Sequence, residues 1–219
     1  MSVHIDSKIP LLLIGGGGHC ESVIDVIKKN NHFHIVGIVE SDDSNIAEVN
    51  GIPVIGRDKD LPALIKTTRN CVVTIGQVGL DSVRQNLFAK VKSLGGILPV
   101  ISSPLAHIAE SACIGEGTVI MHHALVNSGA VIGRNCIVNS KALVEHHTKI
   151  GDFCHIATAA VINGDCDIGN NCFIGSSATI KQGVAISSET VIGAASYVHQ
   201  STQESGTYFG SPAMLRGNA

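Results

Sequence analysis

Three ionisable side chains stand in a row at Glu145–His147, which reads Glu-His-His, and another histidine, His155, follows soon after. Histidine titrates near neutral pH, so it is the usual general base for taking a proton from an attacking amine or hydroxyl. The plainer interpretation is a row of solvated side chains on a rigid edge. A second pair, His122-His123, suggests zinc, but its spacing is not diagnostic of a ligand set, and we expect no metal.

A run of glycines, Gly15–Gly18, followed by His19, lies between an apolar segment and an amphipathic one. A glycine turn that follows a strand and opens a helix is a place where backbone N–H groups and the helix dipole bind phosphate. The run departs from the full G-x-G-x-x-G pattern because Cys20 stands at the last glycine position, so a tight turn without a ligand is the alternative. Glu40 ends the next apolar segment, where an acidic group commonly meets a ribose or a base.

The elements that must position these groups are set by a six-residue repeat. From Ile108 to Val198 an Ile or Val, here called the leader, recurs at every sixth residue without interruption. A small residue follows each leader four positions later, as Ala112 follows Ile108. This period predicts a left-handed parallel β-helix, in which three hexads form one triangular coil and the leaders stack inside. Gly or Asn is common at the second position, and we expect these residues to adopt the unusual backbone angles of the corners.

The composition excludes several classes of protein. The net charge is −3 and the chain has neither a Lys/Arg run nor a long apolar segment, so we expect no nucleic-acid partner and no membrane span. Seven cysteines with no Cys-x-x-Cys pair indicate reduced thiols in a cytoplasmic protein. Four of them occupy the small-residue position and are expected to be buried, namely Cys136, Cys154, Cys166 and Cys172.

Residues 1–103 predict a different fold, a small Rossmann-like α/β domain, ahead of the β-helix and a C-terminal tail at residues 104–219. Alternating apolar and amphipathic segments indicate a parallel sheet covered by helices. The predicted strands are Ile9–Ile14, His34–Glu40, Ile52–Ile55, Asn70–Ile75 and Ile97–Ile101, and the predicted helices are His19–Asn30, Leu61–Thr67 and Asp81–Leu94.

Taken together, these features resemble the bacterial nucleotide-sugar acetyltransferases related to sialic acid O-acetyltransferase, over nearly the whole chain. That family of hexapeptide acyltransferases includes the enzymes that N-acetylate UDP-4-amino-4,6-dideoxy sugars in the bacillosamine pathway and the GDP-perosamine N-acetyltransferases. The resemblance is carried by the strand–glycine turn–helix start, the acidic end of the second strand, Ile75-Gly76 with Arg84, Asn139-Ser140, Glu145-His146, His155 and the tail Gly210–Ala213.

The resemblance implies a homotrimer, with acetyl-CoA between neighbouring β-helices and the nucleotide held by the N-terminal domain. It implies His146 as the catalytic base, with Glu145, His147 and Asn139 beside the reaction centre. The implied nucleotide-sugar site is Gly15, Gly16, Gly17, Gly18, His19, Glu40, Gly76 and Arg84, and the implied coenzyme site is His155, Gly164, Ser176, Ala194, Pro212 and Arg216. Relatives usually carry Asp or Glu directly after the base, where this chain has His147. Either Glu145 substitutes from the other side, or the base works unassisted.

We therefore expect an enzyme that moves an acetyl group from acetyl-CoA to the 4-amino group of a nucleotide-linked 4-amino-4,6-dideoxy sugar. UDP is the favoured nucleotide, and the product would serve bacterial surface glycan or glycoprotein synthesis. One alternative is an O-acetyltransferase acting on a sialic-type sugar. Another, from a different class, is a non-catalytic nucleotide-sugar-binding protein. Coenzyme A release with candidate acceptors separates the three.

Overall fold

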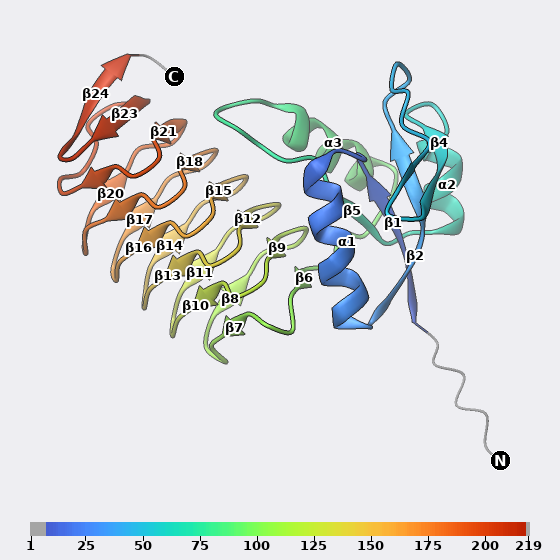
Figure 1. Cartoon of the computed structure of the whole chain (residues 1–219), viewed down its shortest axis with the longest axis horizontal. Helices are drawn as coiled ribbons and strands as arrows, with labels where there is room; N and C mark the ends of the chain where they lie inside the picture. The colour runs from blue at the N-terminus through green and yellow to red at the C-terminus, as the bar shows by residue number, and fades with distance from the viewer. Residues whose placement is uncertain (1–7, 218–219) are drawn as a thin grey trace.

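The computed structural model describes residues 8–217 and has two parts that lie end to end (Figure 1). A small α/β part precedes a long prism of short parallel strands, which confirms the predicted α/β domain followed by a left-handed β-helix. Within the described residues, no helix has the length and apolar character needed to cross a membrane.

The α/β part is built on a five-stranded sheet, and the first apolar segment of the sequence is one of its inner strands. The sheet order is β3-β4-β2-β1-β5, and all its pairings are parallel except that of β3 with β4. Its elements are β1 (Ile9–Ile14), α1 (Gly18–Asn30), β2 (Phe33–Glu40), β3 (Glu48–Val49), β4 (Ile52–Arg57), α2 (Leu61–Thr67), β5 (Cys71–Val73) and α3 (Val83–Ser93).

Strand β1 is covered on both faces of the sheet. Successive side chains of a strand point to opposite faces, and in β1 each set packs against helices. Leu11 and Leu13 pack with the apolar stripe of α1, whereas Leu12 and Ile14 pack with residues of α2 and α3. A strand covered on both faces must be apolar throughout, as this one is after its first residues. The carboxyl end of β1 is thereby fixed, and it opens directly into the glycine turn.

The prism has three faces, each a parallel sheet that takes one strand from every coil. We call them the first face (the sheet of β6), the second face (the sheet of β7) and the third face (the sheet of β8). The strands are β6 (Ile101–Ser102), β7 (His107–Ile108), β8 (Cys113–Ile114), β9 (Val119–Ile120), β10 (Leu125–Val126), β11 (Val131–Ile132), β12 (Ile137–Val138), β13 (Leu143–Val144), β14 (Lys149–Ile150), β15 (His155–Ile156), β16 (Val161–Ile162), β17 (Asp167–Ile168), β18 (Phe173–Ile174), β19 (Thr179–Ile180), β20 (Ala185–Ile186), β21 (Thr190–Ile192) and β22 (Tyr197–Val198), followed by the tail hairpin β23 (Gly206–Gly210) and β24 (Ala213–Gly217).

The leaders and the small residues form one continuous core. From Ile120 onward every leader is buried, and the four predicted cysteines lie in the same cluster, each at most 1% exposed. All seven cysteines are free thiols. Stacking identical positions of successive coils buries a column of apolar side chains that a single hexad could not bury alone.

The second-position glycines have a different role from the one predicted. The left-handed backbone angles occur at the fourth position of the hexad instead, for example at His147 (φ 58°) and Asp165 (φ 57°). A Cβ on the second-position Gly115 would lie 2.5 Å from the carbonyl carbon of Gly133 in the next coil, and one on Gly133 would meet Gly151 equally closely. Glycine is therefore required there because successive coils approach closely, not because the chain turns.

The predicted strand Ile97–Ile101 is wrong as a member of the N-terminal sheet. Ile97 makes only an isolated bridge to Asn70, and Ile101 instead begins β6, which pairs with β9 of the prism. The segment is apolar because it passes between two cores, so the alternation of its residues does not reveal which sheet it joins. Strand β6 thus ties the α/β part to the first face.

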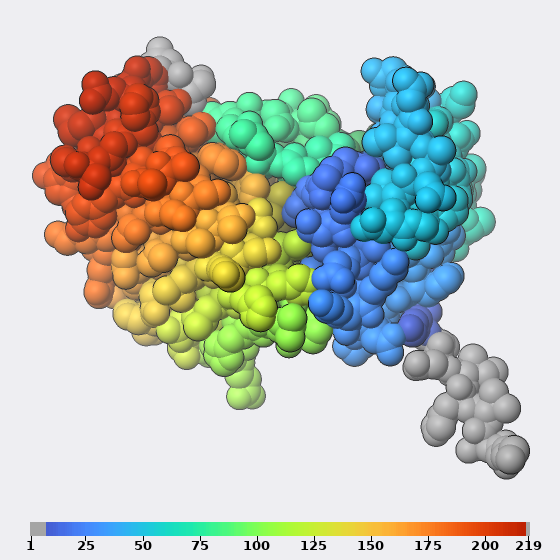
Figure 2. All heavy atoms as spheres, viewed as in Figure 1, coloured from blue at the N-terminus to red at the C-terminus, as the bar shows by residue number. Residues whose placement is uncertain are grey.

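The α/β part is docked around the first face of the prism. At the corner between the third and first faces, the Nη2 atom of Arg84 donates to the backbone oxygen (2.9 Å) and Oδ1 (3.0 Å) of Asn135. Phe88 packs edge-on against Phe153 at the same corner, with 5.5 Å between ring centroids. The space-filling view shows the segment that contains α3 lying over the coils (Figure 2).

At the other edge of the first face, His122 joins three parts of the chain. Its Nδ1 lies 2.6 Å from Ser103 Oγ, and its Nε2 lies 2.7 Å from Asp25 Oδ2 on α1. These residue types also form hydrolase triads, but Ser103 is 3% exposed and its Oγ accepts the backbone N–H of Leu105. The group therefore acts as a clamp that holds α1 against the first coil.

Candidate active site

A cavity of about 480 Å³ opens at the carboxyl end of β1. Every glycine of the turn Gly15–Gly18 lines it, as do His19, Glu40 and Gly76. The ends of parallel strands at which the strand order reverses are the usual ligand site of such sheets, and here β1 lies between β2 and β5. The structure thus brings together all the residues predicted for the nucleotide sugar except Arg84.

The N–H groups at the end of the glycine turn, where α1 begins, are available to an anion, whereas those of Gly15 and Gly16 donate to Val39 and Glu40. Gly17 is the N-cap of α1, at φ −74° and ψ −175°, and no side chain caps this helix end. The first N–H groups of a helix have no partner within the helix, and together with the helix dipole they attract phosphate. Glu40 stabilises the turn from the side, because its carboxylate accepts the N–H of Gly16.

His19 brings no positive charge to this cavity. Burial, and to a smaller extent the nearby Arg84 and His155, lower the pKa of its imidazole to about 3. Its Nε2 atom is buried without a hydrogen-bond partner among the described residues. A neutral imidazole can donate or accept a hydrogen bond, so attraction for a diphosphate depends on the backbone of the turn.

Arg84, predicted at the substrate, is instead part of the contact between the two parts of the chain. Its side chain is 1% exposed, and its Nη1 donates to the backbone oxygens of Val73 (3.2 Å) and Ile75 (2.5 Å). Burial lowers the pKa of the guanidinium to about 10, so it stays charged at neutral pH. A buried charge is retained only when hydrogen bonds satisfy it, as the carbonyl oxygens of β5 and its neighbours do here.

His155 also lies at this contact, on the first face of the prism. It is 7% exposed; its Nδ1 donates to the backbone oxygen of Gln77 (2.6 Å), and its Nε2 accepts from Asn139 Nδ2 (3.1 Å). Burial lowers the pKa of His155 to about 4, against the opposing effect of the Gln77 carbonyl. Asn139 and His155, predicted near the sugar and the coenzyme, therefore form one neutral hydrogen-bonded pair beside the α/β part.

We expect the protein to lose stability as the pH falls from about 6.5 to about 4. His155 has a lowered pKa when folded, so in this window the unfolded chain binds the proton more readily and is favoured. At pH 5 the loss from His155 alone should be about 2 kcal/mol. Urea unfolding at pH 7 and pH 5 measures it. The variant His155→Gln should show a shallower pH dependence but retain some, because His19 titrates with the same sign; an unchanged slope would contradict the assignment.

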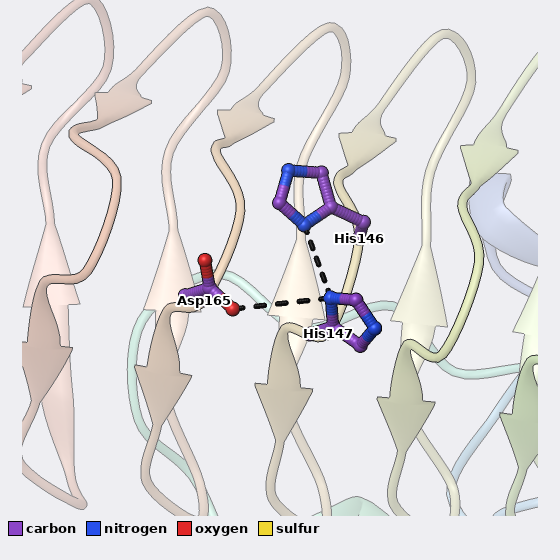
Figure 3. A group of neighbouring side chains, drawn as sticks. All are labelled: His146, His147 and Asp165. Atoms are coloured by element: carbon purple, nitrogen blue, oxygen red, sulfur yellow. Dashed lines mark hydrogen bonds and ion pairs between the residues drawn. The ribbon is translucent and has the colours of Figure 1, made fainter.

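The histidine row lies at another corner, between the second and third faces. Figure 3 shows His146 and His147 with one ring nitrogen of each turned toward the other. Their Nδ1 atoms are 3.2 Å apart. Glycines make room for both rings: a Cβ on Gly164 would lie 2.5 Å from His146 Cε1, and one on Gly129 would lie 2.7 Å from His147 Cδ2. Gly164, predicted in the coenzyme groove, thus lies against the predicted base.

An acidic group near these rings was missed in the sequence. Asp165 Oδ1 lies 3.9 Å from His147 Nδ1. A dashed line in Figure 3 marks this ion pair. The sequence could have predicted this contact. Asp165 follows His147 by three hexads, which is one coil, and therefore occupies the same corner. Glu145, predicted as a possible partner, faces elsewhere: its carboxylate accepts from Asn127 Nδ2 (2.8 Å) and from the backbone N–H of His146 (3.2 Å).

The ligand atoms of His146, His147 and Asp165 all lie within 4.8 Å of one another. Such a group of nitrogen and oxygen atoms is able to hold a divalent cation such as zinc. Acyl transfer from a thioester needs no such ion, because the thioester is already an activated donor. Activity assays that probe these three residues should include a chelator, so that a bound cation does not contribute to the measured rate.

The remaining residues predicted for the coenzyme lie away from His146. Ser176 and Ala194 are exposed at the corner between the first and second faces, in consecutive coils. Pro212 and Arg216 belong to the tail hairpin, which pairs with β21 at the edge of the first face, and the Arg216 guanidinium lies 5.5 Å from the ring centroid of Phe209. The predicted coenzyme residues thus do not lie together in one chain: they are spread over two corners of the prism, its first face and the tail hairpin.

A glycine turn that opens a helix in an α/β part, together with accessible histidines on a hexapeptide β-helix, is typical of the hexapeptide acyltransferases that carry an additional α/β domain. Two family models match the chain: PglD N-terminal domain over residues 10–91, and bacterial transferase hexapeptide (six repeats) over residues 147–182. A search among curated proteins found no match.

Solved structures extend the similarity to nearly the full chain. PerB from Caulobacter crescentus, in complex with CoA and GDP-perosamine, is 31% identical, with 95% of this chain and 97% of that chain covered and a TM-score of 0.88. The acetyltransferase domain of PglB from Neisseria gonorrhoeae, in complex with acetyl coenzyme A, is 31% identical, with 96% and 100% covered and a TM-score of 0.87. WeeI from Acinetobacter baumannii, at 22% identity, 95% and 100% coverage and a TM-score of 0.82, shares the fold.

The chain belongs to the left-handed β-helix acyltransferase family of PglB-type and perosamine sugar N-acetyltransferases.

Proposed function

We propose that the protein transfers the acetyl group of acetyl-CoA to the 4-amino group of a nucleotide-linked 4-amino-4,6-dideoxy sugar. The observation that carries this proposal is that one chain contains both a cavity lined by Gly15–Gly18 and an accessible histidine, His146. The chain is also similar to an enzyme solved with CoA and GDP-perosamine. UDP is the favoured nucleotide, with GDP and dTDP as alternatives, and the product would enter bacterial surface glycan or glycoprotein synthesis.

In the proposed reaction, the sugar nitrogen attacks the thioester carbonyl carbon and a C–N bond forms. His146 takes the proton that the nitrogen loses, as a general base. The tetrahedral intermediate then collapses, the C–S bond breaks, and the thiolate of coenzyme A leaves and accepts a proton. A backbone N–H of the β-helix is the expected donor to the oxyanion.

The position of His146 supports an assembly in which neighbouring chains complete the site. The α/β part contacts the first face and both corners that bound it, through Asn135, His155 and His122. His146 lies at the remaining corner, opposite the first face. The base of one chain is thus separated from the cavity of the same chain by the body of the prism, and we infer a homotrimer in which each cavity meets the base of a neighbour.

A mixing experiment tests this arrangement. The solution mass should be three times 22.8 kDa. At an acceptor concentration well below the KM of Gly17→Val, trimers that combine His146→Ala chains with Gly17→Val chains should be more active than either pure variant, because an intact cavity of one chain then meets an intact base of another. Co-expression with two different tags isolates the mixed trimers. A monomer that turns over substrate, or mixed trimers no more active than the pure variants, would contradict the intersubunit site.

The acceptor is identified by measuring free thiol release with UDP-, GDP- and dTDP-linked 4-amino sugars. Amine acceptors should release coenzyme A, and the matching 4-hydroxy sugars should not. Release with a sialic-type sugar instead would favour O-acetylation. No release with any acceptor, in a protein that still binds the nucleotide sugar, would favour the non-catalytic alternative.

A further inference from the structure

Asp165 and His147 occupy equivalent places in consecutive coils. Both are the fourth residue of their hexad and both have left-handed backbone angles. The backbone N–H of Asp165 donates to the carbonyl oxygen of His146 (3.0 Å), so the coils are in register at this corner. Strands one coil apart are spaced by about 4.8 Å, which lets side chains at equivalent positions reach one another. The carboxylate is held from its far side by Gln182 Nε2, 3.3 Å from Oδ2.

The contacts fix how protons are arranged on the two rings. Two Nδ1 atoms 3.2 Å apart can form a hydrogen bond only if one carries a proton and the other does not. For His146 to act as a base at Nε2, its Nδ1 must carry the proton and donate it to His147 Nδ1. His147 Nδ1 is then an acceptor and offers nothing to Asp165, which agrees with the longer separation of 3.9 Å between them.

The arrangement changes once the base has taken a proton from the substrate. His146 becomes a cation whose Nδ1–H points at His147, and the proton between the two rings is shared or passed to His147. The positive charge then lies next to the Asp165 carboxylate, which attracts it. The carboxylate therefore stabilises the protonated pair more than the neutral pair, and this difference favours proton removal.

We propose that Asp165 is a positioning residue that acts through His147 to support His146 as the base. The inference rests on the proposed function, and it adds a carboxylate one coil away from the base as part of the same unit. In this proposal His147 and Asp165 assist His146. They replace both alternatives that the sequence offered, which were Glu145 as the partner of the base and a base without a partner.

The test is a double-mutant cycle measured by coenzyme A release in the presence of a chelator. Asp165→Asn should lower kcat by about two- to fivefold, the effect of an exposed ion pair, while both KM values stay unchanged. In a His147→Asn background, which removes the ring that carries the charge, Asp165→Asn should have no effect on kcat. Asp167→Asn, an exposed acidic residue on the third face, is the matched control and should change nothing.

In a second background, His147→Asp, the expected effect of Asp165→Asn on kcat is zero or opposite in sign. In His147→Asp, an Oδ atom takes the place of the imidazole Nδ1 and can accept directly from His146, and Asp residues tolerate left-handed angles. Removing the second carboxylate by Asp165→Asn should then leave kcat unchanged or raise it. An equal loss in all three backgrounds would show a merely structural role and overturn the proposal, as would full activity of Asp165→Asn in the otherwise wild-type chain. Absence of any turnover by the wild-type protein would instead reject the proposed function.

Discussion

Replacing His146 by alanine is expected to lower kcat by about 10²–10⁴-fold, the usual contribution of a positioned general base. A sugar amine is mostly protonated at neutral pH, and only its free-base form attacks a carbonyl. Neither KM should change much, because the ring lies at the corner between the second and third faces and does not line the cavity that we propose for the nucleotide. Steady-state kinetics with acetyl-CoA and the preferred acceptor measure the effect.

The neighbouring histidine provides the control. His147→Ala should cost less than about tenfold, because this ring supports the base and does not take the substrate proton. If His147 were the base, the two effects would be exchanged. If both variants kept nearly full kcat, the histidine mechanism would be wrong, and positioning of the bound substrates would have to account for the rate.

Gly17→Val should raise the KM for the nucleotide sugar by about 10- to 100-fold, the loss expected when one or two charge-assisted hydrogen bonds to phosphate are prevented. The free protein should tolerate the change, since a Cβ at Gly17 has nothing within 4 Å and φ is −74°. The added side chain would occupy the cavity where the helix N-terminus meets the ligand. Isothermal titration with the nucleoside diphosphate alone would measure the same loss without catalysis.

Acetyl-CoA is the internal control for that variant. Its KM should be unchanged, because the cavity belongs to the α/β part and the coenzyme is proposed to bind between prisms. Equal losses for both substrates, with an unchanged unfolding midpoint, would argue against separate sites. A loss of stability without a change in KM would instead identify Gly15–Gly18 as a tight turn with no ligand.

The parts of the fold that follow from local pattern could be predicted from the sequence. The leader column, the buried cysteines and the strand–turn–helix around Gly15–Gly18 depend on residues close together in the chain. Segments whose partners are distant in the chain were harder to assign to a sheet. Ile97–Ile101 passes between two apolar cores, so the alternation of its residues does not show which sheet it joins.

The candidate site shows the same limit. The family resemblance predicts Arg84 at the nucleotide sugar, whereas its burial against Asn135 depends on how the two parts dock. Asp165 reads as an ordinary surface residue until the coil length is used to bring it beside His147. A carboxylate one residue from a histidine is easy to notice, and one that is a whole coil away is found only after the architecture has been inferred.

The prism also separates what stability requires from what chemistry requires. The interior repeats every hexad, because each leader is an Ile or Val and can replace any other. The outside repeats only every third hexad, since the chain needs three strands to return to the same face. Losing one hexad before Val144 would preserve the packed interior yet carry His146 to a different edge. Losing three hexads, which is one whole coil, would keep His146 at its original edge. Lineages of such proteins should therefore change length in whole coils, although the loss of a single hexad would leave the interior equally well packed.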